Sequence, residues 1–304
     1  MEPIAAYTKE LLSKSIRTFH DPTRIKYLLP TDLEGIILQM QLIFTLDVYK
    51  SVYIETNRLI KLFSAPITKQ LENGIRVLDA GCGPGCWSLD MAVKYKNSQF
   101  YGVDVLETQF PQDSDKPTNT GFVLGDLADN IPYPRDTFDF IYQRLLSLAF
   151  TKEQWKQNLK ELERVLKPGG YLELTELQYN HREKLEYGPS FKRQQEAGIY
   201  VDKHQESEYS HNVQVEKYQI SRGFKEISKS VKQQTFCSSK KASKDIEFTG
   251  DAILCAFSSL GTGLSEIVPE WQDSSVYETQ LQNCRLEALA NNAQLYCTIH
   301  IARK

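Results

Sequence analysis

The chain has 304 residues, of which 41% are hydrophobic and 25% charged, so it contains enough apolar side chains for a sizeable core. Its formal net charge is −3, which excludes a general electrostatic attraction to nucleic acid or to an acidic membrane surface. No apolar block follows the charges of residues 1–20, and the most apolar stretch, 36–44, is short and contains two glutamines. We therefore expect no secretory signal, no membrane insertion and no nucleic-acid partner.

The six cysteines follow no regular spacing and include no Cys-x-x-Cys pair. Reduced thiols in an intracellular protein are the simplest explanation, so we expect a cytoplasmic protein, with the nucleus as a compatible location. Cys82 and Cys86 are four residues apart but have no second pair of Cys or His nearby, so no metal site is predicted.

Residues 1–70 are predicted to form a helical extension that acts as a lid. Apolar residues recur at helical spacing between positions 33 and 63. Pro30, Thr31 and Asp32 offer a chain break and a helix cap before that segment.

From residue 75 the pattern changes to strands that alternate with helices. Strands are expected at 75–80, 99–105, 121–126, 137–142 and 171–176. An amphipathic helix is expected at 154–166, and the Lys-Pro-Gly-Gly run at 167–170 ends it. This alternation is typical of a mostly parallel sheet with right-handed crossovers.

The last third of the chain is less regular. We expect a polar strand at 224–236, a helix at 276–291 and a final strand at 294–301, which would complete a seven-stranded sheet with an antiparallel edge. Residues 71–304 are therefore predicted to form one α/β domain of Rossmann-like fold with helices on both faces. Insertions are expected at about 177–220 and 237–290.

A glycine-rich turn at 79–85 joins the first predicted strand to the next helix. Gly81, Gly83 and Gly85 would let the chain turn tightly and bring its backbone against a ligand. Cys86 stands where a dinucleotide-binding Gly-x-Gly-x-x-Gly motif has its third glycine, and no Gly-Lys-Ser/Thr follows. The spacing therefore disfavours a diphosphate-binding loop and excludes a P-loop.

Two carboxylates follow the next two strands. Asp104 ends the second strand, where a carboxylate can accept both hydroxyls of a ribose, and Asp126 beside Leu127 ends the third, where it could take an adenine amino group. Open α/β sheets bind ligands at this edge, so a nucleoside site is expected there. The alternatives are that Asp79 caps the following helix and that the other two aspartates are ordinary turn residues.

Together these motifs resemble the class I S-adenosylmethionine-dependent methyltransferases. The resemblance covers about residues 70–180 and rests on five segments in order, 77–85, 102–104, 125–127, 131–140 and 162–173. More narrowly, residues 27–32 and 142–144 look like fungal methyltransferases related to regulators of secondary metabolism.

The resemblance implies S-adenosyl-L-methionine as the cofactor and nine residues as its binding site. The methionine end would lie on the glycine turn, the ribose on the end of the second strand, the adenine beyond it and on the third, and the sulfonium beside the fourth. In that order, the residues are Asp79, Gly81, Cys82 and Gly83; Asp104; Val105, Asp126 and Leu127; and Gln143.

The expected function is methyl transfer to an unidentified acceptor, a small molecule rather than a protein. A general base is required only when the acceptor arrives protonated, and no catalytic residue is assigned. The first alternative is a methyltransferase-like regulatory protein that acts through partner contacts. The second is a nicotinamide-dependent oxidoreductase, which the glycine spacing disfavours.

Overall fold

The computed structural model of the chain describes residues 62–107, 110–144, 146, 149–178, 188–190, 192–193, 223–235, 268–291 and 294–304. Of the predicted helical extension, residues 1–70, only residues 62–70 are among those described. The predicted insertions lie partly outside the described residues as well.

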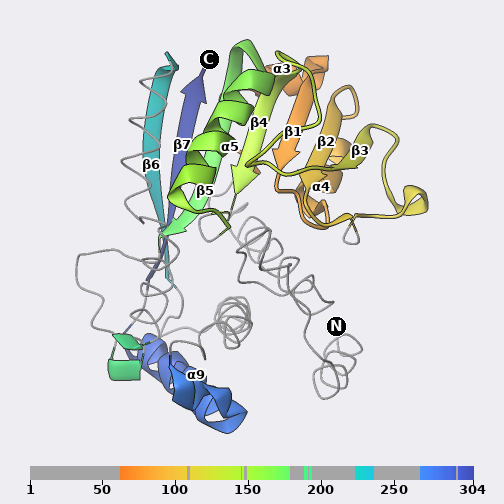
Figure 1. Ribbon diagram of the computed structural model, residues 1–304. Coiled ribbons are helices and arrows are strands. Elements are labelled where there is room, and N and C mark those ends of the chain that lie inside the picture. The colour runs from red at the N-terminus through yellow and green to blue at the C-terminus, as the bar shows by residue number, and fades with distance from the viewer. Residues whose placement is uncertain are drawn as a thin grey trace.

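A seven-stranded sheet forms the centre of the fold, with the order β3-β2-β1-β4-β5-β7-β6 (Figure 1). The strands are β1 Arg76–Ala80, β2 Gln99–Asp104, β3 Thr120–Leu124, β4 Phe138–Arg144, β5 Leu166–Gln178, β6 Lys225–Thr235 and β7 Gln294–Arg303. The first five strands pair in parallel and follow the Rossmann order 3-2-1-4-5. The predicted Rossmann-like α/β fold is therefore confirmed.

The antiparallel strand has a different position from the one expected. β7 runs antiparallel to both of its neighbours, but it lies between β5 and β6 and is not the edge of the sheet. Thr298, Ile299, His300 and Ala302 of β7 are buried, whereas β6 is rich in lysine, serine and glutamine. Because an edge strand has one side open to solvent, the polar strand takes the edge and the more apolar one takes the interior.

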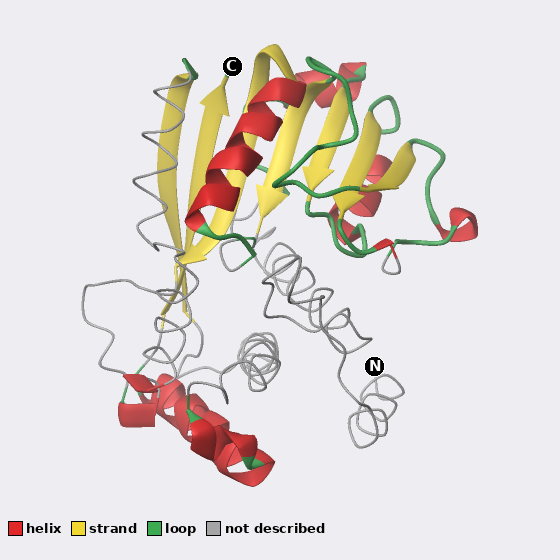
Figure 2. Cartoon of the chain, in the orientation of Figure 1, coloured by secondary structure: helices red, strands yellow, loops and turns green. Residues whose placement is uncertain are grey.

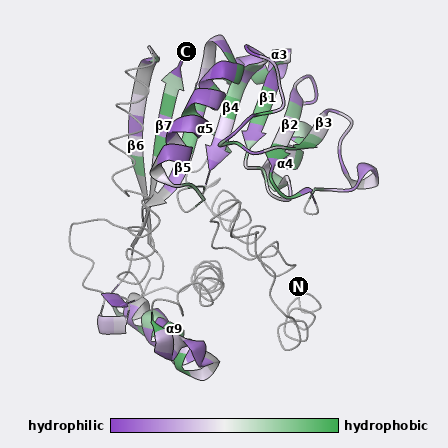
Figure 3. Ribbon diagram, viewed as in Figure 1, coloured by the Kyte–Doolittle hydropathy of each residue, from purple (hydrophilic) through white to green (hydrophobic). Residues whose placement is uncertain are grey.

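Helices cover both faces of the sheet (Figure 2). One face packs against α5, Lys152–Val165, and the other against α3, Thr68–Asn73, and α4, Cys86–Lys94. β1 lies between these layers with four of its five residues buried. Figure 3 shows apolar residues along the central strands and polar residues on the outer side of α5, as an amphipathic helix over a buried sheet requires.

The Lys-Pro-Gly-Gly run ends α5, as expected, but it also belongs to β5. Pairing with β4 moves from Leu166 opposite Phe138 to Tyr171 opposite Phe140, so the run forms a bulge. Gly169 has φ 79°, a conformation that favours glycine. Through this bulge α5 passes directly into the next strand.

The segment just before α3 is tied to the sheet by one buried carboxylate and one indole. Glu173 of β5 accepts hydrogen bonds from the backbone N–H of Ser64, at 2.9 and 2.7 Å, and of Ala65, at 2.7 Å. The Trp87 Nε1–H donates to the carbonyl of Leu62 at 2.8 Å. The described end of the predicted lid is thus fixed on the α4 face of the sheet.

Described parts of the two predicted insertions contact each other. The Gln280 amide, on α9 (Ser274–Ala290), donates to the carbonyl of Ser190 at 2.7 Å, and the Ser190 N–H donates to Glu287 at 3.1 Å. Trp271 of the 3₁₀ helix η3, Pro269–Gln272, packs on Tyr277 with ring centroids 5.1 Å apart. Of the helices in the described ranges, none has the length and apolar character needed to cross a membrane.

The stability of the protein should depend on pH through Glu173. Burial raises the pKa of Glu173 from 4.5 to about 7, although its backbone hydrogen bonds lower the pKa in part. Between these values the unfolded chain releases a proton that the folded chain retains, so the free energy of unfolding falls as pH rises, by up to about 3 kcal/mol. Glu173→Gln should flatten this decline when chemical unfolding is measured from pH 4 to pH 8.

The matched control is Glu153→Gln, which makes the same change at an exposed carboxylate of α5. Its unfolding free energies should run parallel to those of the wild type. If Glu173→Gln also ran parallel, Glu173 would not carry the raised pKa.

Candidate cofactor site at the carboxyl ends of the strands

The glycine turn after β1 has a backbone that only glycine readily adopts. Gly81, Gly83 and Gly85 have φ values of 74°, 51° and 75°, in the left-handed region that side chains disfavour. A Cβ on Gly81 would lie 2.6 Å from Leu146 Cδ1, and one on Gly85 would lie 2.3 Å from Phe122 Cε1. The Gly-x-Gly-x-Gly spacing therefore reflects both backbone conformation and close packing.

Asp104 connects the end of β2 to this turn. Its Oδ2 accepts a hydrogen bond from the Gly83 N–H at 2.9 Å, and its Oδ1 accepts one from the Leu106 N–H at 3.2 Å. Burial raises the pKa of Asp104, and these N–H groups partly oppose the rise. Each carboxylate oxygen can accept a second hydrogen bond, so the predicted ribose contact is compatible with the bonds present.

Asp79 is buried beneath the turn, with 3% of its surface exposed. Its Oδ2 accepts the Ser88 hydroxyl at 2.8 Å. Burial raises its pKa to about 6, and the Ser88 hydrogen bond and the positive charge of Arg144 offset this only in part. Ser88 is in the first turn of α4, so its hydroxyl attaches the Asp79 carboxylate to the start of that helix through a side chain.

The two adenine-binding residues predicted after β3 differ in the solvent exposure of their side chains. Asp126 is half-buried, and its Oδ1 accepts the Ala128 N–H at 2.8 Å. Leu127 is 3% exposed, and its side chain packs in the core on the α5 side of the sheet. Of these two side chains, the Asp126 carboxylate is the one that can hydrogen-bond an adenine edge.

Two further predicted residues flank these acids. Val105 follows Asp104 and is half-buried. Cys82 donates its thiol to the Gly83 carbonyl at 3.5 Å, and its Sγ would lie 2.7 Å from a Cβ on Gly102. Burial raises the pKa of this thiol well above its usual value, with Asp79 and Asp104 adding to the rise. Cys82 is therefore a neutral packing group inside the turn.

Gln143 is fully buried at the end of β4, opposite Ala80 of β1. Neither its Nε2 nor its Oε1 has a hydrogen-bond partner in the described structure. An unpaired buried polar group costs about 1–3 kcal/mol, which indicates that a polar group other than the described protein atoms completes this site. Gln143 stays a predicted contact of the sulfonium side of the cofactor.

The sequence alone did not single out the aromatic support beneath the site. Trp87 stacks on Tyr142 with ring centroids 4.3 Å apart and an interplanar angle of 18°. Tyr142 is in register with Asp79 on one side and with Glu173 on the other. The helical spacing of Trp87 predicts a buried residue, but its partner on β4 follows only from the strand order.

Comparison with known proteins identifies the central part of the chain. Residues 77–170 match the family model described as a methyltransferase domain. The N-methyltransferase gliN of Aspergillus fumigatus is 34% identical over 125 residues, which are 40% of this chain and 43% of that protein. The secondary metabolism regulator LAE1 of Cochliobolus heterostrophus is 31% identical over 139 residues, 45% of this chain and 43% of that protein.

Among solved structures, the [4+2]-cyclase SpnF aligns with a TM-score of 0.46 and 19% identity, over 77% of this chain and 76% of that one. The chain matches less than half the length of the two curated relatives above. Residues 77–170 thus match a methyltransferase domain, and the resemblance to class I S-adenosylmethionine-dependent methyltransferases drawn from the sequence, including its fungal branch, is confirmed.

The ribose contact assigned to Asp104 can be tested with a substitution that keeps the shape of the side chain. Asp104→Asn should weaken S-adenosylhomocysteine binding about tenfold, because one carboxylate oxygen becomes an NH2 donor and the remaining oxygen is an uncharged acceptor. Isothermal titration calorimetry would measure this change.

Asp113→Asn is the matched control. Asp113 is an exposed carboxylate in the 3₁₀ helix η2, Asp113–Asp115, and it pairs with Lys116, which follows that helix. Its affinity should equal that of the wild type. Equal affinity for folded Asp104→Asn would remove Asp104 from the site.

Proposed function

We propose that this chain is an S-adenosylmethionine-dependent methyltransferase that methylates a small molecule. The observation that carries the proposal is the Asp104–Gly83 hydrogen bond at the carboxyl ends of β1 and β2, within the methyltransferase domain. It holds a carboxylate and a glycine turn together where α/β sheets bind nucleosides.

The charge of the site favours a cationic ligand. Asp79 and Asp104 are close enough for the charge of Asp104 to raise the pKa of Asp79, and Arg144 lowers it only in part. A sulfonium or an α-ammonium would stabilise such carboxylates, whereas a diphosphate would be repelled by them. This supports the methyltransferase over a nicotinamide-dependent oxidoreductase.

The contribution of the chain to the reaction is binding, orientation and exclusion of water. S-adenosylmethionine would supply a methyl group already activated on a cationic sulfur. The backbone of the glycine turn would contact the methionine end, the Asp104 carboxylate would hold the ribose, and the buried Gln143 amide would face the sulfonium. In-line transfer requires that donor and acceptor be held collinear in a dry site.

A nitrogen atom is the acceptor we favour. The relatives include N-methyltransferases, gliN of Aspergillus fumigatus and sirN of Leptosphaeria maculans among them. A neutral amine needs no general base to attack a methyl group. His300 does not supply one from β7, because burial lowers its pKa to about 4 and it is only 2% exposed.

The surroundings of the acceptor site are part of this proposal. Residues 1–70 would act as a helical lid, and the insertions at about 177–220 and 237–290 would cover the acceptor. The anchoring of residues 62–65 to β5 and α4 and the contacts of Ser190 with α9 support this division.

A regulatory protein that acts through partner contacts is the second candidate function. The similarity to LAE1, a secondary metabolism regulator, favours it. For either function we place the protein inside the cell, in the cytoplasm or the nucleus, because Cys82, Cys86 and Cys284 are free thiols.

Methyl transfer can be measured with S-adenosylmethionine that carries a labelled methyl group. Incubation with a cell extract separated into small-molecule and protein fractions should transfer label to the small-molecule fraction, onto nitrogen. Asp104→Asn should lower the rate at limiting cofactor, because it weakens binding of the donor, and Asp113→Asn should not. Label in the protein fraction alone would contradict a small-molecule acceptor, and no transfer despite cofactor binding would favour the regulatory function.

A further inference from the structure

The chain between β3 and β4 contains the predicted adenine-binding residue Asp126 but contains no helix or strand. Within this connection, the carbonyl of Asp126 accepts the N–H groups of Asp129 and Asn130 at 3.2 and 3.1 Å. These bonds close one turn and attach it to neither neighbouring strand. Leu127 and Ile131 of this connection pack in the core, and polar contacts from another element hold its backbone.

One face of α5 supplies the attachment. Its four contacting residues have the i, i+1, i+4, i+7 spacing of a single helix face, and all contact backbone groups of the connection. They are Gln157, Asn158, Glu161 and Arg164.

The first half of this helix face contacts residues 127–129 of the connection, and the second half contacts residues 131–133. The Gln157 and Asn158 amides donate to the carbonyls of Asp129 and Leu127 at 3.4 and 3.5 Å. The Glu161 Oε2 accepts the Ile131 N–H at 3.1 Å. The helix therefore binds the connection at several points beyond Asp126.

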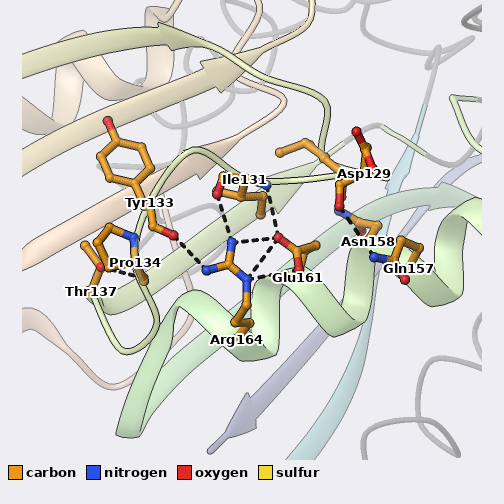
Figure 4. Close-up of polar contacts among 10 residues, drawn as sticks. Asp129, Ile131, Tyr133, Pro134, Thr137, Gln157, Asn158, Glu161 and Arg164 are labelled. Carbon is orange, nitrogen blue, oxygen red and sulfur yellow. Dashed lines mark hydrogen bonds and ion pairs between the residues drawn. The ribbon is translucent and has the colours of Figure 1, made fainter.

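Arg164 makes the shortest of these contacts (Figure 4). Its Nη1 donates to the Tyr133 carbonyl at 2.7 Å and its Nη2 to the Ile131 carbonyl at 2.8 Å. The same guanidinium pairs with Glu161 through Nε and Nη2, at 3.0 and 2.7 Å. One planar group thus fixes the Ile131 and Tyr133 carbonyls and the carboxylate that binds the Ile131 N–H, which a point charge such as lysine cannot do.

The pair is more than a helix-surface ion pair. The Glu161 side chain is 8% exposed and that of Arg164 is 23% exposed, and the pairing lowers the pKa of Glu161 and raises that of Arg164. Both charges stay ionised while they hold neutral backbone groups, and charge-assisted hydrogen bonds are the stronger ones.

We propose that Arg164 and Glu161 are positioning residues that set where Asp126 meets the adenine of the cofactor, without touching the cofactor themselves. This inference rests on the proposed function, because it requires an adenine-containing ligand. It gives α5 a role beyond packing, since the helix transmits its own position to the base-binding turn.

The test uses two ligands that differ at one edge of the base, at the amino group that Asp126 would contact and at N1, which carries a hydrogen only in the inosyl compound. S-adenosylhomocysteine has the adenine amino group, and S-inosylhomocysteine has an oxygen in its place. The wild type should prefer the adenosyl compound about tenfold, the scale of a charge-assisted hydrogen bond. Arg164→Lys should weaken binding of the adenosyl compound at least about threefold and leave the inosyl compound unchanged.

Two variants keep the experiment decisive. Arg164→Lys retains the positive charge beside Glu161 and is therefore expected to fold. It is used in place of Arg164→Met, which would leave Glu161 without its partner. Lys167→Met is the matched control. It removes another ion pair, Lys167–Asp139 at 2.8 Å, which lies at the start of β4, away from the carboxyl ends of the strands where the cofactor site is proposed. This control should keep the tenfold preference of the wild type.

The outcomes separate this inference from the proposed function. Equal weakening of both ligands by Arg164→Lys would show a merely structural role and overturn the inference. A wild type that binds both ligands equally well would overturn it too, while leaving cofactor binding intact. A wild type that binds neither ligand would overturn the proposed function, and the inference with it.

Discussion

The hydrogen bond between the Asp104 carboxylate and the Gly83 N–H is the contact on which the site depends. It joins the end of β2 to the turn after β1, so the two central elements of the site are held next to each other. The bond requires the Gly83 N–H to point at β2, and the left-handed backbone of Gly81, Gly83 and Gly85 directs it there. A side chain at Gly81 or Gly85 would collide with Leu146 or Phe122. The same glycines thus shape the turn and leave its backbone open to a ligand.

The two faces of the sheet support this edge in different ways. On the α4 face, Glu173 and Trp87 hold residues 62–65 against the strands, and the stack of Trp87 on Tyr142 lies in the same row as Asp79. On the α5 face, polar side chains of the helix hold the connection that contains Asp126. Buried polar groups specify position here because each one must keep its partner. The site is therefore positioned from both layers of the fold.

Much of the fold could be predicted from the sequence, because each element has a local signal. The apolar run of β1, the glycine spacing and the period of α5 predicted those elements to within a few residues. The inner position of β7 could not be predicted in this way, since pairing between strands far apart in sequence leaves no local pattern. Glu173 was missed for a related reason: its partners Ser64 and Ala65 are more than 100 residues earlier in the chain. Asp104 and Asp126 were predicted as site residues because strand ends have a sequence signal, whereas Arg164 looks like an ordinary charged helix residue.

The central claim is that the glycine turn and Asp104 form a site for S-adenosylmethionine and not for a dinucleotide. Calorimetric titration of the full chain with S-adenosylmethionine, S-adenosylhomocysteine and NAD tests this most directly. The account predicts saturable binding of the first two, one ligand per chain, and no heat of binding with NAD. Tight binding of NAD without any response to S-adenosylhomocysteine would contradict it.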